Sequence, residues 1–123
     1  MRTICLSSSL KYKDTARRVI YEFKEMGIDA LFPNLDSGLD KDNLDMQTMK
    51  RLCINHFCAI DKSEALYVIN PNGYIGTFVK IEIGYATGIG KPIYYSEKTN
   101  ELDLDSLYTD IIPIGKLEKF VEF

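Results

Sequence analysis

The stretch ALYVINPNGYIGTFVKIEIGYATGIGKPIYY, residues 65–95, decides the fold of this chain. Residues 65–69 and 92–95 are continuous apolar runs, which is typical of strands buried on both faces. Between them, residues 70–73 (Asn-Pro-Asn-Gly) have the chemistry of a tight turn, and residues 77–88 predict a helix. A strand, a turn, a helix and a second strand in this order indicate a unit of a parallel sheet covered by helices.

The rest of the chain repeats this alternation of strands and helices. Gly27 is suited to end the first helix, and an acidic polar loop is expected at 34–43. Residues 96–108 are expected to be irregular or briefly helical, and the last residues to form an amphipathic tail. The remaining predicted strands are 3–7, 28–32 and 111–114, and the remaining predicted helices are 12–26 and 44–61. The pattern predicts one α/β domain, residues 1–123, with a three-layer doubly wound fold of about five parallel strands.

Composition limits the classes of function. The chain has 123 residues, of which 46% are hydrophobic and 27% charged, so it can bury a core without disulfides or metal. A net charge of -3 argues against binding to a nucleic acid polymer. There is no leader-like N-terminus and no run of ~20 apolar residues, so we expect a cytoplasmic protein without a membrane segment. Cys53, His56 and Cys58 do not share one helix face, and no metal site or cofactor is expected.

Polar turns follow three of the predicted strands, where ligands bind in folds of this type. The turn over 70–77 leads into the predicted helix 77–88. Gly73 and Gly76 permit positive φ and a close approach of the backbone, and Thr77 can cap the helix. Such a turn could cradle a sugar hydroxyl or a phosphate, or it could simply reverse the chain.

Glu82 is the leading candidate for a chemical role. Its helical neighbours three and four positions away carry no charge: Phe78, Val79, Tyr85 and Ala86. A carboxylate without a local ion partner is either exposed at an edge or directed into a cleft, and it is expected to be anionic at neutral pH.

Structural roles are expected for most other polar residues. His56 lies on the apolar stripe of the second helix and is interpreted as a core or cap histidine, with a role in the site as the alternative. Asp61 is expected to close that helix, with a position lining the cleft as the alternative. Tyr74 and Tyr85 could stack on a base or only pack.

Four segments carry a resemblance to a known family. NPNGYIG (70–76), EIGYA (82–86) and GKPI (90–93) resemble the nucleoside 2-deoxyribosyltransferase superfamily, and ICLSSS (4–9) is similar to the first strand and loop of its small, largely uncharacterised branch. The resemblance covers nearly the whole chain. It implies a flavodoxin-like fold, a nucleophilic role for Glu82, and a site completed by a neighbouring subunit of a homo-oligomer.

The activity implied by the resemblance is cleavage or exchange of a nucleoside or nucleotide N-glycosidic bond. A carboxylate can stabilise the oxocarbenium-like state and then trap it as a glycosyl ester. Transferases of the superfamily usually carry an aspartate where this chain has Gly76 and Thr77, so transfer and hydrolysis both stay open. The alternatives are a non-catalytic nucleotide-binding module on the same fold and an interaction subunit without a ligand.

The expected ligand is a nucleoside or a nucleoside monophosphate. The residues expected to bind it are Ser7, Ser8, Ser9, Asn70, Gly73, Tyr74, Gly76 and Thr77. Three successive hydroxyls before a helix favour a 5′-monophosphate over the free nucleoside. An apolar surface around Tyr85, Tyr94 and Tyr95 is expected to support the homo-oligomer.

Overall fold

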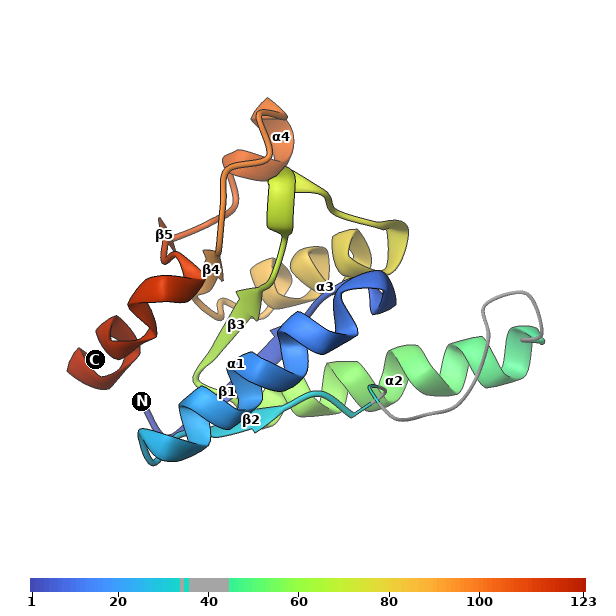
Figure 1. Ribbon diagram of the computed structural model, residues 1–123. Helices are drawn as coiled ribbons and strands as arrows, with labels where there is room; N and C mark the ends of the chain where they lie inside the picture. Colours follow the sequence, from blue (N-terminus) through green and yellow to red (C-terminus); the bar gives the residue numbers. More distant parts are fainter. Residues whose placement is uncertain (34, 36–44) are drawn as a thin grey trace.

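The computed structural model describes residues 1–33, 35 and 45–123, so the acidic loop expected at 34–43 lies outside the described residues except for Leu35. One parallel sheet of five strands runs through the molecule in the order β2-β1-β3-β4-β5 (Figure 1). The strands are β1 (Thr3–Ser7), β2 (Asp29–Leu31), β3 (Ala65–Val68), β4 (Ile93–Tyr95) and β5 (Asp110–Ile111). This order is the flavodoxin-like one. The predicted three-layer α/β fold is therefore confirmed.

Helices cover both faces of the sheet (Figure 1). On one face lie α1 (Lys13–Glu25) and a C-terminal 3₁₀ helix, Ile114–Glu122; on the other lie α2 (Met46–Lys62) and α3 (Thr77–Gly88). A short helix, α4 (Leu102–Asp105), follows β4. Among the described residues, no helix is long and apolar enough to cross a membrane.

The alternation of side chains along the central strands builds two cores. In β1, Ile4 and Leu6 face α1, whereas Cys5 faces α2 and α3. On the α1 side, the fully buried rings of Phe23, Tyr67 and Phe120 pack edge to face, with ring centroids 4.9–6.1 Å apart. The C-terminal helix is thereby joined to the sheet through aromatic contacts.

Several predicted boundaries shift for local reasons. The first helix begins at Lys13 rather than at 12, because a short 3₁₀ turn (Leu10–Tyr12) precedes it. The helix predicted to start at 44 begins at Met46, where the Asp45 side chain accepts a hydrogen bond of 2.7 Å from the Thr48 amide. The strand predicted at 111–114 is β5 at 110–111, because Pro113 has no amide hydrogen for the ladder and caps the C-terminal helix.

The turn after β3 is fixed by the buried side chain of Asn70. Its Nδ2 donates to the Glu97 carbonyl at 2.7 Å, and its Oδ1 accepts from Ser96 Oγ and the Glu97 amide at 2.8 and 3.1 Å. Gly73 ends the turn at φ +76°, and a Cβ there would lie 2.8 Å from the Lys98 carbonyl oxygen. Only glycine fits this position without strain.

Replacing Gly73 with alanine is therefore expected to lower the free energy of unfolding by about 1–3 kcal/mol, because it adds both a positive-φ penalty and a steric contact. Urea denaturation measures the change. Gly84→Ala is the matched control: Gly84 is exposed in the middle of α3 with no atom within 4 Å of the added Cβ. That variant is expected to be more stable by about 0.5–1 kcal/mol. Equal effects from the two substitutions would contradict this account of the turn.

Candidate active site

The site lies at the carboxyl edge of the two central strands, β1 and β3. The chain leaves β1 toward α1 on one face of the sheet and leaves β3 toward α3 on the other. Where neighbouring strands diverge in this way, the sheet has a crevice in which ligands bind in open α/β folds. Ser7 is the last residue of β1, and Glu82 lies in the second turn of α3, on the face directed at the sheet.

Glu82 is buried at this crevice, with 6% of its surface exposed. Ser7 Oγ donates a hydrogen bond to Glu82 Oε2. The same oxygen lies 3.3 Å from Nε2 of His56, which reaches it from α2. Three elements therefore bring one polar side chain each to a single point in an otherwise apolar interior.

His56 is held in one tautomer. Its Nε2 lies 2.9 Å from the Leu6 carbonyl oxygen, which can only accept, so Nε2 carries the hydrogen. The edge of the imidazole packs against Phe32, with centroids 5.8 Å apart. Burial lowers the pKa of His56 to about 4, and the hydrogen bond to Leu6 opposes this shift. The ring is therefore neutral at pH 7.

Burial acts on the Glu82 carboxyl in the opposite direction. It raises the pKa of Glu82 to about 8, and the hydrogen bond from Ser7 only partly offsets this rise. The expectation that Glu82 is anionic at neutral pH is therefore wrong for this structure: the resting pair is a protonated carboxyl beside a neutral imidazole. The interior holds too little water to solvate a charged carboxylate or a charged imidazolium.

The three serines after β1 separate into two groups. Ser7 is fully buried and engaged with Glu82. Ser8 and Ser9 are partly exposed; Ser8 Oγ donates to the Ser9 carbonyl at 3.2 Å, and Ser9 Oγ accepts from the Lys11 amide at 3.4 Å. Only Ser8 and Ser9 have hydroxyls directed away from the carboxyl.

The turn before α3 differs from its prediction at two residues. Gly76 has φ -81°, so it does not use the positive-φ freedom expected of it. Gly76 rather than Thr77 is the N-cap, and no side chain caps the helix, so the predicted capping role of Thr77 is wrong. Thr77 is exposed in the first turn, and Asn70 is occupied in shaping the loop.

Tyr74 lies beside this turn and is 46% exposed. Its ring packs edge-on against Tyr12 at 6.3 Å, Lys11 Nζ lies 3.6 Å from its centroid, and its hydroxyl is near Gly76. Tyr85 instead stacks on Phe57 at 4.3 Å and donates a hydrogen bond of 2.8 Å to Asp61. Tyr74 is therefore about half exposed beside the turn, whereas Tyr85 joins α2 to α3.

His56 is the member of the site that sequence reasoning placed in the core. The structure confirms its burial but adds its contact with Glu82. Two features of the sequence could have indicated a site role for His56. It is the chain's single histidine, and it lies on the apolar stripe of a helix that packs near the end of β1. Within the described residues, no group of three or more His, Cys, Asp or Glu side chains is arranged to hold a metal ion.

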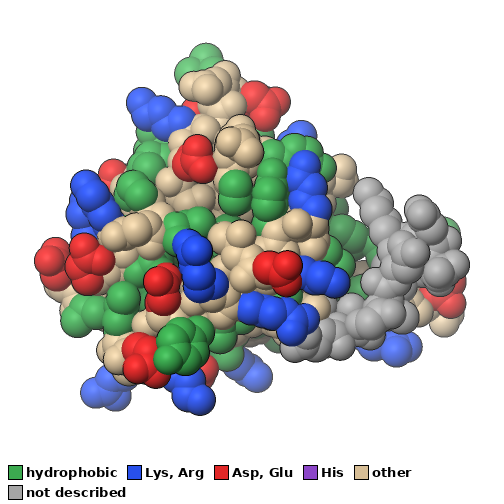
Figure 2. Space-filling view, viewed as in Figure 1, with side chains coloured by type: hydrophobic (Ala, Val, Ile, Leu, Met, Phe, Trp, Pro, Cys, Tyr) green, Lys and Arg blue, Asp and Glu red, His purple; other side chains and the backbone are tan. Residues whose placement is uncertain are grey.

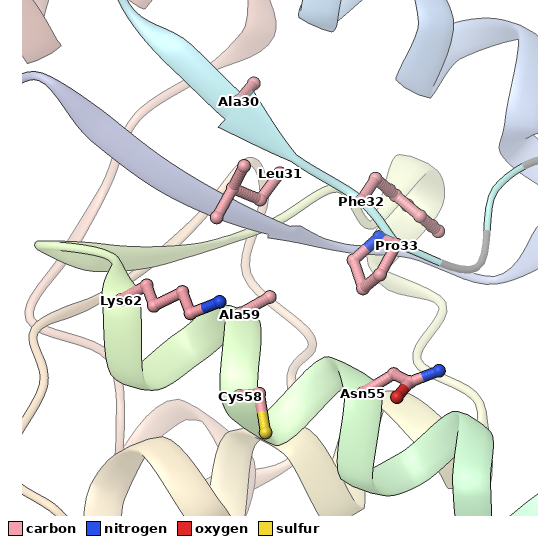
Figure 3. A pocket seen from close by; sticks show the side chains of 8 residues that line it. All are labelled: Ala30, Leu31, Phe32, Pro33, Asn55, Cys58, Ala59 and Lys62. Atoms are coloured by element: carbon pink, nitrogen blue, oxygen red, sulfur yellow. The ribbon is translucent and has the colours of Figure 1, made fainter.

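A separate hollow of about 430 Å³ lies between β2 and α2 (Figure 3). Leu31, Phe32 and Pro33 line it from the strand side, and Asn55, Cys58 and Lys62 are among the residues that line it from α2. Phe32 is shared between this hollow and the packing around His56.

On the face shown in Figure 2, acidic and basic side chains are interspersed and form no large area of one sign.

Comparisons with known proteins support the fold. No family model matches the sequence, and no curated protein matches it. Among solved structures, the 2-deoxyribosyltransferase of Bacillus psychrosaccharolyticus is 19% identical with a TM-score of 0.65, covering 94% of this chain and 90% of its own. A conserved protein from Enterococcus faecalis V583 is 14% identical with a TM-score of 0.66, and the match covers 98% of this chain and 99% of that protein. The CMP N-glycosidase BcmB of Clostridium botulinum is 17% identical with a TM-score of 0.58, covering 98% of both chains.

These structures match along nearly the whole of each chain. They show that this chain has the same fold as a 2-deoxyribosyltransferase and a CMP N-glycosidase, which is the fold that the resemblance implies. At such low identity the likeness concerns the fold, and the chemistry has to be argued from the residues of this chain.

The buried carboxyl predicts a characteristic dependence of stability on pH. Glu82 has a folded pKa of about 8 against an ordinary value of 4.5, so the folded state binds the proton more tightly and its stability falls as pH rises through this interval. Glu82→Gln removes this loss. We expect the variant's stability relative to wild type to be greater at about pH 9 than at about pH 5, measured by urea unfolding. A difference that does not change with pH would contradict the assignment.

Proposed function

We propose that this protein is an enzyme that cleaves or exchanges the N-glycosidic bond of a nucleoside or nucleotide, with Glu82 as its nucleophile. The observation that carries the proposal is the buried carboxyl of Glu82 at the β1/β3 crevice, held by Ser7 and His56. Two structures with the same fold are a 2-deoxyribosyltransferase and a CMP N-glycosidase, which supports this class of reaction.

The position of Glu82 is costly for a purely structural residue. Burial raises its pKa by disfavouring the charged form, and none of its described contacts is with a lysine or arginine. A glutamine or an apolar residue would fill the same space without this penalty. Strongly shifted acids of this kind concentrate at functional sites.

The proposed reaction has two steps. The ionised carboxyl of Glu82 attacks C1′ of the sugar while the C1′–N bond breaks, and the bonding electrons leave with the base. The poorly hydrated surroundings strengthen the attraction between the carboxylate and the oxocarbenium-like sugar. Water or a second base then attacks C1′ and releases Glu82, which distinguishes hydrolysis from transfer.

Base release from a panel of ribo- and deoxyribonucleosides and their monophosphates, with and without an acceptor base, tests this proposal by chromatography. Glu82→Gln keeps the size of the side chain but cannot form the ester, so base release is expected to fall at least about a thousandfold while ligand binding survives. The rate for wild type is expected to rise with pH through about 8, since only the ionised carboxyl attacks.

Glu25→Gln is the matched control. Glu25 is exposed at the end of α1, at the opposite edge of the sheet from Glu82, and its substitution is expected to leave base release unchanged. Turnover of any substrate by Glu82→Gln at the wild-type rate would refute the nucleophile assignment.

A non-catalytic nucleotide-binding module is the second candidate. The observation that favours it is the protonated state of Glu82 at neutral pH, in which the carboxyl is a poor nucleophile. Binding of a nucleotide without base release, even at about pH 9, would support this module over the enzyme.

We also propose that a 5′-monophosphate binds more tightly than its nucleoside. Ser8 and Ser9 are partly exposed after β1, and the exposed Lys11, two residues further on, carries a cation that lies over the Tyr74 ring. Calorimetry with one nucleotide and its nucleoside is expected to show the preference, and Ser8→Ala/Ser9→Ala is expected to weaken nucleotide binding by about tenfold. Equal affinities for the two ligands would favour free nucleosides as substrates.

A homo-oligomer, most simply a dimer, is also proposed, but its expected surface needs correction. Tyr94 and Tyr95 are 5% and 0% exposed and belong to the core. The apolar side chains exposed on the neighbouring helices α2 and α3 include Ile54, Ile81 and Ile89.

Light scattering at micromolar concentration is expected to give twice the chain mass of 14.1 kDa. Ile81→Lys, which places a charge on the outer face of α3, is expected to reduce this mass. Val121→Lys, at an exposed position of the C-terminal helix on the other side of the sheet, is the control. A wild-type protein that is monomeric under these conditions would contradict the proposal.

A further inference from the structure

The two oxygens of Glu82 are in different environments. Ser7 Oγ donates to Oε2, and His56 Nε2 lies 3.3 Å from the same atom. Within the part of the chain that the structure describes, both polar side-chain contacts of this carboxyl are with Oε2, and none is with Oε1.

The direction of these contacts identifies the state of each oxygen. Leu6 presents a carbonyl to His56, so Nε2 carries a hydrogen and donates it to that carbonyl at 2.9 Å, and this N–H edge of the ring lies 3.3 Å from Oε2. Ser7 also donates to Oε2. Because the Ser7 hydroxyl donates to Oε2 and the N–H edge of His56 lies beside the same atom, we place the proton of the neutral acid on Oε1.

We propose that His56 is a positioning residue that, together with Ser7, fixes Oε2 as the hydrogen-bonded oxygen of Glu82 and leaves Oε1 as the atom that attacks C1′ of the substrate. This inference rests on the proposed function and specifies it. His56 does not touch the substrate in this arrangement; it acts through the carboxyl.

The two oxygens of Glu82 have different roles in the proposed reaction. Oε1 releases its proton to solvent and then bonds to C1′ as the C1′–N bond breaks, with the electron pair leaving on the base. Oε2 becomes the carbonyl oxygen of the glycosyl ester and keeps its hydrogen bond from Ser7 and its contact with the N–H edge of His56. When water or a second base attacks C1′, the electrons of the C1′–Oε1 bond return to Oε1.

The other titratable groups near the carboxyl are thiols. Burial and, to a lesser extent, the nearby Glu82 carboxylate raise the pKa of Cys5 on β1 and of Cys53 on α2. Among the described residues, Ser7 donates to the carboxyl, and the His56 ring lies 3.3 Å from it.

Two substitutions at His56 separate its donor function from its bulk. His56→Phe keeps an aromatic ring beside Phe32 but removes the N–H, whereas His56→Gln keeps an N–H at a similar reach. Carbon-13 NMR of the glutamate carboxyl groups follows the ionisation of Glu82, whose signal is assigned by its loss in Glu82→Gln. Removing the donor destabilises the carboxylate, so the midpoint in His56→Phe is expected to rise by about one pH unit or more.

The glutamine variant is expected to stay within a few tenths of a unit of wild type, and thereby to restore the titration. In kinetics, His56→Phe is expected to lower kcat about tenfold with little change in KM, and the rate profile is expected to shift to higher pH. If His56→Phe does not fold, His56→Leu replaces it as the variant without a donor.

Ser63→Ala is the matched control. Ser63 is as buried as His56 and donates a hydrogen bond of 2.7 Å to the Ala59 carbonyl, but it is the C-cap of α2 and has no described contact with Glu82. Its loss is expected to lower stability without moving the Glu82 midpoint.

The outcomes separate the two proposals. A wild type that releases base, with the same Glu82 midpoint in His56→Phe, overturns the positioning role alone. A midpoint that rises in His56→Phe and returns in His56→Gln, in a wild type that releases no base from any substrate, supports the role of His56 at Oε2 and overturns the proposed function.

Discussion

The exclusion of water from one carboxyl group is the constraint on which the site depends. Glu82 faces the interior from α3, and the low polarity there raises its pKa to about 8. The same exclusion lowers the pKa of His56 to about 4, so the two groups meet as neutral partners. A carboxylate formed in this environment has little hydration to lose, which strengthens its attraction to a nearby positive charge.

The sheet determines where this carboxyl can lie. Because β1 and β3 are adjacent while their following helices lie on opposite faces, the edge between them stays free of a crossover. Ser7 reaches Glu82 from the end of β1, and His56 approaches from α2, which contacts both β1 and α3. Residues separated by 75 positions in the chain meet because of this topology rather than through local sequence.

The fold could be predicted from the sequence to a large extent because its signals are local. The apolar run before Asn70 and the glycine-rich turn before Glu82 indicate a strand and a helix independently of the rest of the chain, and the helix over 77–88 was predicted with its observed bounds. The fifth strand was displaced, since two residues carry too short a pattern to fix a boundary.

The site was predictable only in part. The absence of charged helical neighbours singled out Glu82, but its burial and its protonation depend on contacts from β1 and α2 that no local pattern encodes. His56 was placed correctly in the interior, while its approach to Oε2 depends on how α2 crosses the sheet. For Tyr94 and Tyr95 the prediction was wrong: they were expected to form an apolar surface, and they are buried in the core.

The side chain of Asn70 also has a consequence for the order of assembly. Every hydrogen bond described for its side chain is with Ser96 or Glu97, and both of these residues follow β4 in the chain. The turn that leads into α3 therefore acquires its shape only after β4 has paired with β3. A nascent chain that ends before Ser96 lacks these bonds. The crevice around Glu82 therefore reaches its final shape late in folding, when most of the sheet has formed.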